Sequence, residues 1–133
     1  MAGNPAAAPE IPVSWGELID KLTILEIKSE RLESPEALAN VLREIRLISR
    51  LAQDVQKDIV VAALAEELRA VNSELWDIED AIRRKEAAGA FDDEFIRLAR
   101  SVYKRNDARA ALKRKINLQL DSNIQEEQSY AAY

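Results

Sequence analysis

Cysteine and histidine are both missing from this chain of 133 residues, and their absence excludes several kinds of chemistry. Without a thiol the chain has no disulfide and no cysteine nucleophile. Without an imidazole it has no histidine base, no Ser-His-Asp triad and no typical zinc ligand set. A bound metal ion would therefore need oxygen ligands, which favours magnesium or manganese over zinc.

Glycine and proline are scarce, with three and four residues respectively. Three of the prolines lie among alanines near the start of the chain, a composition that favours an extended backbone. We therefore expect residues 1–12 to form a flexible arm rich in proline and alanine. The long stretch that follows contains few helix breakers, which predicts a single helical domain over residues 13–121 and a partly ordered tail over residues 122–133.

Long apolar runs and excess positive charge are missing as well. No segment approaches the roughly 18 apolar residues of a membrane span, and the first residues lack the pattern of a signal peptide. The 24 acidic and 19 basic residues give a net charge of -5, which provides no general attraction for nucleic acids or anionic membranes. We expect a cytoplasmic protein that has neither a nucleic acid nor a membrane as its partner.

Local signals predict where the first two helices begin. Glu17 follows Ser14 at the spacing of a capping box, so a first helix is predicted from Ser14 to about residue 33. Ser34 and the proline after it then supply a cap and a first helical residue. The second helix is predicted to reach about residue 55, followed by a turn before residue 59.

Two further helices complete the predicted fold. Apolar residues recur every three or four positions between residues 64 and 82, which is the periodicity of a helix. Gly89 is predicted to end this third helix in the left-handed conformation, and Asp92 to cap a fourth. Four helices with short links predict an all-α fold, either an antiparallel four-helix bundle or a set of long helical hairpins.

Polar residues interrupt the apolar face of the fourth predicted helix. Steps of three and four residues from Phe95 reach Asn106 and Arg109 before apolar residues resume at Leu112. Because an unpaired buried amide or guanidinium is costly, these groups must contact acidic side chains, water or a ligand. The sequence leaves two interpretations open: an internal network that fixes helix register, or a pocket for a small anionic ligand.

The predicted pocket combines cationic and acidic side chains with one indole from the first, third and fourth helices. A tryptophan on a bundle helix is more often a core residue than a ligand contact, so a core position is the favoured interpretation of Trp76. The candidate ligand-binding residues are Lys21, Lys28, Arg31, Trp76, Asp77, Asp80, Arg83, Asn106, Asp107 and Arg109.

Two E-x-x-D motifs offer a third interpretation, a metal site. Carboxylates three residues apart on a helix point the same way, so two such pairs could supply four oxygen ligands. We expect no cofactor, and magnesium or manganese are the ions that this pattern would suit. The pattern resembles the paired acidic motifs of the all-α nucleoside triphosphate pyrophosphohydrolases, although the two motifs lie farther apart here. The candidate metal ligands are Glu17, Asp20, Glu74 and Asp77.

Three longer segments resemble a family of small uncharacterised bacterial proteins, a domain of unknown function. The segments are IPVSWGELIDKLTILEIKSERL, LRAVNSELWDIEDAIRRKE and FIRLARSVYKRNDARAALKRKIN. The resemblance covers most of the chain after residue 10. It implies no specific activity, but an association with genes for surface polysaccharide or lipopolysaccharide assembly would imply an accessory protein, or an enzyme that handles a sugar nucleotide.

Two functions therefore remain open. The first is a binding or assembly module that self-associates into a homo-oligomer through its long apolar faces and binds a small anionic ligand in the polar pocket. The second is an enzyme acting on a nucleotide or sugar nucleotide, such as a magnesium-dependent phosphohydrolase. The sequence alone does not decide whether the chain is an enzyme.

Overall fold

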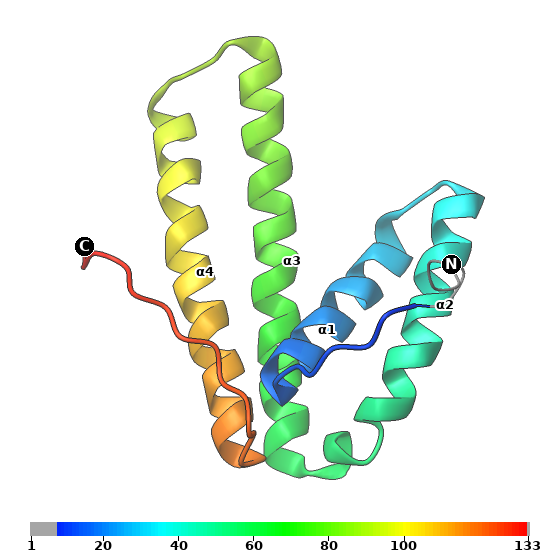
Figure 1. Cartoon of the computed structure of the whole chain (residues 1–133). Coiled ribbons are helices and arrows are strands. Elements are labelled where there is room, and N and C mark those ends of the chain that lie inside the picture. The colour runs from blue at the N-terminus through cyan, green and yellow to red at the C-terminus, as the bar shows by residue number, and fades with distance from the viewer. Residues whose placement is uncertain (1–7, 133) are drawn as a thin grey trace, which may run out of the picture.

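The computed structural model describes residues 8–132, and this part of the chain is built from helices joined by short links (Figure 1). The all-α class predicted from the sequence is confirmed. Residues 8–13 are exposed and not helical, whereas the first seven residues of the predicted arm lie outside the described residues. The elements are α1 (Trp15–Arg31), α2 (Pro35–Ala52), the short 3-10 helix η1 (Val55–Lys57), α3 (Ile59–Ala88) and α4 (Asp93–Gln119).

Side-chain caps begin the four α-helices. The Ser14 hydroxyl accepts the amide of Glu17, and the Ser34 hydroxyl accepts the amide of Ala37. The carboxylate of Asp58 caps α3 and that of Asp92 caps α4. Each cap satisfies backbone donors that the first turn of a helix leaves free, which explains why the predicted helix starts are confirmed.

Two predicted helix ends differ from the structure. The second helix ends at Ala52, three residues before the predicted end, and the chain passes through η1 before α3 begins. The partly buried Val55 in η1 packs against the core, so the turn is fixed by a tertiary contact that local sequence does not encode. The first helix ends at Arg31 because Leu32 is already extended, ahead of the next cap.

Gly89 ends α3 in the left-handed conformation, with a φ of 63°. A Cβ at this position would meet no atom within 4 Å, so backbone strain alone decides the effect of a larger residue. We expect Gly89→Ala to lower the free energy of unfolding by about 1 to 2 kcal/mol, the usual cost of a left-handed non-glycine residue. Urea denaturation measures this loss. An unchanged midpoint would contradict the assignment of the cap.

The helices form two hairpins that diverge from a common base (Figure 1). The α3–α4 hairpin is the longer one, and α1 crosses its lower half and contacts both helices. By contrast, α2 packs mainly on α1 and stands on the outer side. Of the two arrangements predicted, the structure therefore has helical hairpins and not a closed four-helix bundle.

The hydrophobic core lies where α1 crosses the α3–α4 hairpin. It combines Ile19 and Leu22 of α1 with residues from both long helices. Burial of each such side chain contributes roughly 1.5 to 3 kcal/mol before conformational entropy is subtracted. The predicted apolar series of α3 is fully buried only in its middle, from Leu68 to Leu75, because Leu64, Ile78 and Ile82 are half-buried. The remaining core residues are Ala52, Leu68, Val71, Leu75, Leu112 and Ile116.

The residues after α4 form a tail that has no helix up to residue 132. The residues after α4 turn back at Asp121, which has a φ of 49°, and then run without helix beside the lower half of α4 (Figure 1). None of the helices between residues 8 and 132 combines the length and the apolar character needed to cross a membrane.

Candidate functional site

A buried carboxylate lies at the point where α1, α3 and α4 meet. The side chain of Asp20 on α1 is 1% exposed. Arg109 of α4 donates two hydrogen bonds to this carboxylate, from Nε to Oδ1 at 2.9 Å and from Nη2 to Oδ2 at 2.5 Å. This bidentate geometry is the strongest form of the arginine–carboxylate pair. The hydrogen bond to Asp20 raises the pKa of Arg109 above its ordinary value.

A third helix completes the same network. The amide nitrogen of Asn72 on α3 donates to Asp20 Oδ1 and to Thr23 Oγ1, both at 2.9 Å. Thr23 in turn donates to the backbone oxygen of Asp20 at 2.7 Å. Within residues 8–132 every buried side-chain nitrogen and oxygen has a hydrogen-bond partner. We name Asp20, Thr23, Asn72 and Arg109 the polar junction, and its geometry fits a network that fixes how the helices cross.

The start of α1 is tied to the end of α4 by backbone-directed hydrogen bonds. Asn117 of α4 accepts the amide of Gly16 at 2.7 Å, and Ser122 accepts the amide of Trp15 at 3.3 Å. The hydroxyl of the fully buried Ser14 donates to Glu126 of the tail at 2.7 Å. The negative charge of Glu126 also suits the positive end of the helix dipole. The tail is thus anchored at two points to the first turn of α1.

Gly16 allows this close approach between α1 and α4. A Cβ on Gly16 would lie 2.9 Å from Asn117 Oδ1 and closer still to the carbonyl oxygen of Lys113. Real Cβ atoms do not come so near to backbone oxygens. Beside this contact, Lys113 Nζ forms a salt bridge of 2.6 Å with Glu17, so Glu17 does not complete the capping box but binds α4.

Asn106 and Arg109, which form the predicted polar interruption of the fourth helix, lie in different environments. Arg109 reaches the polar junction, as an inward-facing residue should. Asn106 is exposed, so the expectation that it lies within the apolar face is wrong. The reason is geometric: the polar contacts of α1 on α4 reach only as far as Arg109, so α1 does not cover Asn106.

The other predicted ligand-binding residues form separate pairs. Arg31 hydrogen-bonds Asp77 at 2.5 Å, which raises the pKa of Arg31, and its guanidinium lies 5.6 Å from the ring centroid of Trp76. Lys21 forms a salt bridge of 3.5 Å with Glu44 on α2. Asp80 pairs with Arg84 one turn away. Arg83 is exposed and Lys28 is half-buried. The ten candidates therefore do not line one common pocket.

The four predicted metal ligands do not converge either. Each of them has a basic partner: Glu17 pairs with Lys113, Asp20 with Arg109, Glu74 with Arg105 and Asp77 with Arg31. Among residues 8–132 no group of three or more acidic side chains is placed to hold a metal ion. The E-x-x-D spacing brings neighbouring carboxylates together on one helix, but it does not fix how two helices are rotated against each other.

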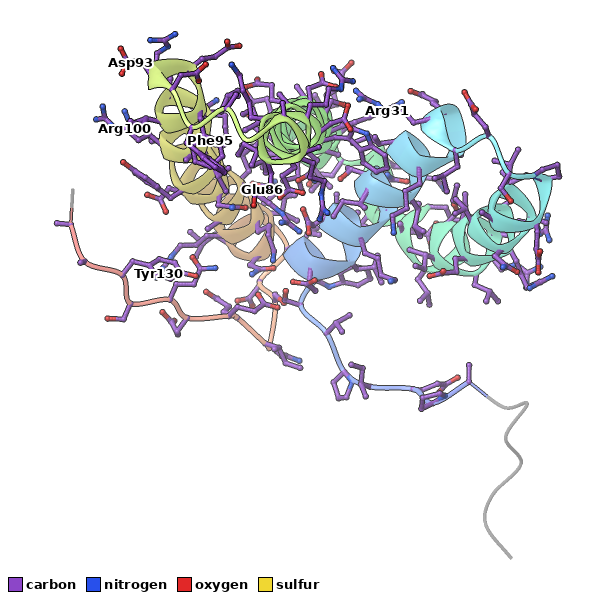
Figure 2. All side chains as sticks on the ribbon, turned by 90° about the horizontal axis from the view of Figure 1, so that it is seen from above. Arg31, Glu86, Asp93, Phe95, Arg100 and Tyr130 are labelled. Atoms are coloured by element: carbon purple, nitrogen blue, oxygen red, sulfur yellow. The ribbon has the colours of Figure 1, made fainter. Side chains whose placement is uncertain are left out.

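A cavity lies between α4 and the tail. It has two adjoining compartments with volumes of about 400 and 690 Å³. Asp107, Lys113 and Tyr130 line both compartments, while Asn106 and Arg109 line the larger one. Figure 2 shows Tyr130 on the tail, beside α4 and away from the α1–α2 hairpin. Three predicted ligand-binding residues, Asn106, Asp107 and Arg109, thus share this cavity.

The upper half of the α3–α4 hairpin has no third helix against it (Figure 1). At about 1.5 Å per residue α3 is roughly 45 Å long and α1 only about 25 Å. The polar contacts of α1 end at Asp77 on α3 and at Arg109 on α4. Above them Phe91 is 59% exposed and Ile96 is 52% exposed. We name the surface formed by Phe91, Phe95, Ile96, Ala99 and Val102 the open hairpin face.

Of the polar junction, Thr23 was not singled out from the sequence, although a signal for a buried polar face was present. Gly16, Asp20, Thr23 and Ile27 follow steps of four, three and four residues and form a second buried face of α1. Asn72 likewise stands between the buried Leu68 and Leu75 on α3. Polar residues within an apolar series indicated Arg109 on the fourth helix, and the same rule indicates that these positions are buried.

Comparison with known proteins gives one match. The model of one protein family, described as a family of unknown function (DUF6165), matches residues 10–133. No curated protein gave a match, and neither did any solved structure. The predicted membership in a domain family of unknown function is confirmed, whereas the predicted bacterial source and the polysaccharide association stay predictions.

Proposed function

We propose that this chain, which belongs to the DUF6165 family of unknown function, is an assembly module that pairs with a second copy of itself. The two copies join through the open hairpin face, so that two α3–α4 hairpins form one intermolecular four-helix bundle. This is the self-association expected from the sequence, now assigned to a particular surface. The observation that carries it is the apolar surface left uncovered above α1.

Side-chain directions on α4 support this surface. Phe95 points toward α3 while Arg100 points away from it (Figure 2). Ile96, Ala99 and Tyr103 follow spacings of three and four residues and so share a third side of the helix, next to that of Phe95. Ile96 and Ala99 are exposed there, and Val102 is half-buried. Two helices alone cannot cover each other's apolar sides, which is why isolated hairpins pack into larger bundles.

A second hairpin suits this face better than a small ligand or a single peptide. The small side chain of Ala99 allows close packing of helix against helix, while the phenylalanines at the tip provide large apolar surfaces. Phe91 and Phe95 already pack edge to face, with ring centroids 5.2 Å apart. Because a two-fold interface uses every residue twice, even a modest patch on one chain gives a substantial buried area.

The polar junction supports the same function over the enzyme alternative. Its carboxylate and guanidinium satisfy each other, and Asn72 and Thr23 use the remaining hydrogen-bonding capacity. A substrate that bound there would have to break a buried ion pair, which is strongly unfavourable. We therefore interpret the junction as the support that holds α1 against the hairpin, and the apolar face above it as the functional surface.

The proposal predicts that Ile96→Glu turns a dimer into a monomer. The change places a carboxylate in the apolar interface twice, once from each copy. Loss of burial alone amounts to about 3 kcal/mol for the two chains, so the dissociation constant should rise about 100-fold or more. Sedimentation velocity over a range of protein concentrations measures the mass of each species.

Leu47→Glu on α2 is the matched control. Leu47 is 57% exposed, close to the 52% of Ile96, but it lies on the other hairpin. Both variants should keep the helical circular dichroism of the original chain, because both side chains are already largely exposed. A dimer that survives Ile96→Glu but dissociates with Leu47→Glu would reject the open hairpin face, and a monomer at all concentrations would reject self-association.

A further inference from the structure

We infer that the cavity between α4 and the tail is a binding site for an uncharged small molecule rich in hydroxyl groups. The site lies within one chain and shares only Val102 with the open hairpin face, so it does not depend on self-association. Its compartments of about 400 and 690 Å³ fall in the range of small-molecule pockets. Residues of α4 form one wall, and tail residues from Gln125 onward form the other.

The charges around the cavity argue against an anionic ligand. Arg109 is bound to Asp20, Lys113 to Glu17 and Arg114 to Glu127, so the cations that line the cavity already have carboxylate partners. Asp107 lies half-buried on the same wall, and none of the ion pairs within residues 8–132 involves it. An anion would be repelled by Asp107 and would compete with these carboxylates.

A cationic ligand is disfavoured for the opposite reason. Although Asp107 would attract it, Arg109 and Lys113 line the same compartment, and Arg114 lies in the smaller one. A ligand without net charge avoids both kinds of repulsion. It must nevertheless donate a hydrogen bond, because a carboxylate such as Asp107 only accepts.

The hydrogen-bonding groups of the walls suit hydroxyls. Asn106, Gln128 and the Tyr130 hydroxyl each both donate and accept, as a ligand hydroxyl does. Between these groups, Val102 and Ala110 offer apolar surface for the C–H side of a ring. The tyrosine ring adds a flat face that a saturated ring can lie against. A molecule of one or two sugar-sized rings fits both the volume and this alternation of polar and apolar wall.

The anchoring of the tail explains how the second wall stays in place. Ser122 and Glu126 bind the first turn of α1, so the tail residues just beyond them are held near α4. Glu127 adds a salt bridge of 4.0 Å to Arg114 of α4. Tyr130 lies three residues past this last anchor and is 75% exposed, so it can move aside without breaking these contacts. The structure thus combines a fixed wall, α4, with a second wall that is fixed at one end only.

Site-resolved NMR tests this inference. Sucrose and maltose serve as the uncharged probes, glucose 1-phosphate as the anionic probe and glucosamine as the cationic one. Sugars stabilise proteins generally by exclusion from the surface, so amide shifts at named residues are a better readout than melting temperature. We expect the uncharged sugars to shift amides of residues 102–113 and 128–132, and to bind about ten-fold more tightly than the charged probes.

Two variants connect the shifts to the cavity. Asp107→Asn removes a charged acceptor and should weaken sugar binding about ten-fold or more, and Tyr130→Ala should weaken it as well. Glu67→Gln, the same kind of change at an exposed position on α3, is the control and should leave binding unchanged. All three should keep the fold, which circular dichroism verifies.

The results that would overturn the inference are equally specific. One is the absence of shifts at residues 102–113 and 128–132 with either uncharged sugar at concentrations up to about 20 mM, well above a millimolar dissociation constant. Another is tighter binding of glucose 1-phosphate or glucosamine than of the uncharged sugars. A third is sugar binding that Asp107→Asn leaves intact. Because the site lies within one chain, the monomeric Ile96→Glu variant should still bind the sugars, which separates this test from that of self-association.

Discussion

Asp20→Ala is expected to lower the free energy of unfolding by about 3 to 5 kcal/mol, the range observed when one partner of a buried ion pair is removed. Asp20 is 1% exposed, and its carboxylate accepts hydrogen bonds from both Arg109 and Asn72. Removing it leaves the Arg109 guanidinium without its acceptor and the Asn72 amide with Thr23 alone. Urea denaturation followed by circular dichroism measures the loss, and the unfolding midpoint should fall accordingly.

Glu17→Ala provides the comparison within the same helix. Glu17 also binds a cation of α4, but its side chain is 40% exposed, so water can replace the lost partner. This variant should therefore cost less than about 1 kcal/mol. If Asp20→Ala were no more destabilising than Glu17→Ala, the polar junction would not be what holds the three helices together.

Gly16→Ala is expected to destabilise the protein by about 2 kcal/mol, although alanine is the better helix former. An alanine Cβ would overlap the backbone carbonyl of Lys113, and a backbone atom cannot move aside as the end of a side chain can. Overpacking of this kind costs about 1 to 3 kcal/mol. The hydrogen bond between the Gly16 amide and Asn117 would also be displaced.

The sign of this effect separates two explanations of Gly16. Helix propensity alone predicts that alanine stabilises the helix by up to about 1 kcal/mol. Close packing of α1 against α4 predicts the opposite. Asn117→Ala removes the same hydrogen bond without introducing a clash, so it should cost less than Gly16→Ala. A Gly16→Ala variant more stable than the original chain would contradict the observed approach of the two helices.

Much of the secondary structure could be predicted because its signals are local. Ser14, Ser34 and Asp92 cap helices through hydrogen bonds to residues three positions away, and Gly89 ends a helix through its own backbone angle. Such signals need no knowledge of the fold. The end of the second helix was predicted less well, because the turn at Val55 depends on packing against the core.

The candidate sites could be predicted only in part, since they depend on how helices cross. Arg109 was expected to face inward and does so, but its partner Asp20 was placed in a metal site. Asn106 follows the same periodicity as Arg109 and is nevertheless exposed, because α1 crosses α4 lower down. Periodicity indicates which residues share a face. It does not indicate where a shorter helix stops covering that face.

The measurement that tests the central claim most directly is backbone hydrogen exchange at protein concentrations below and above the dimerisation range. Hydrogen exchange reports local opening of the backbone. The upper half of the α3–α4 hairpin, which no third helix covers, should open easily in the monomer. The account predicts that raising the concentration slows exchange in peptides covering residues 78–102 and leaves α2 unchanged. Slower exchange confined to α2, or no dependence on concentration anywhere, would contradict pairing through the open hairpin face.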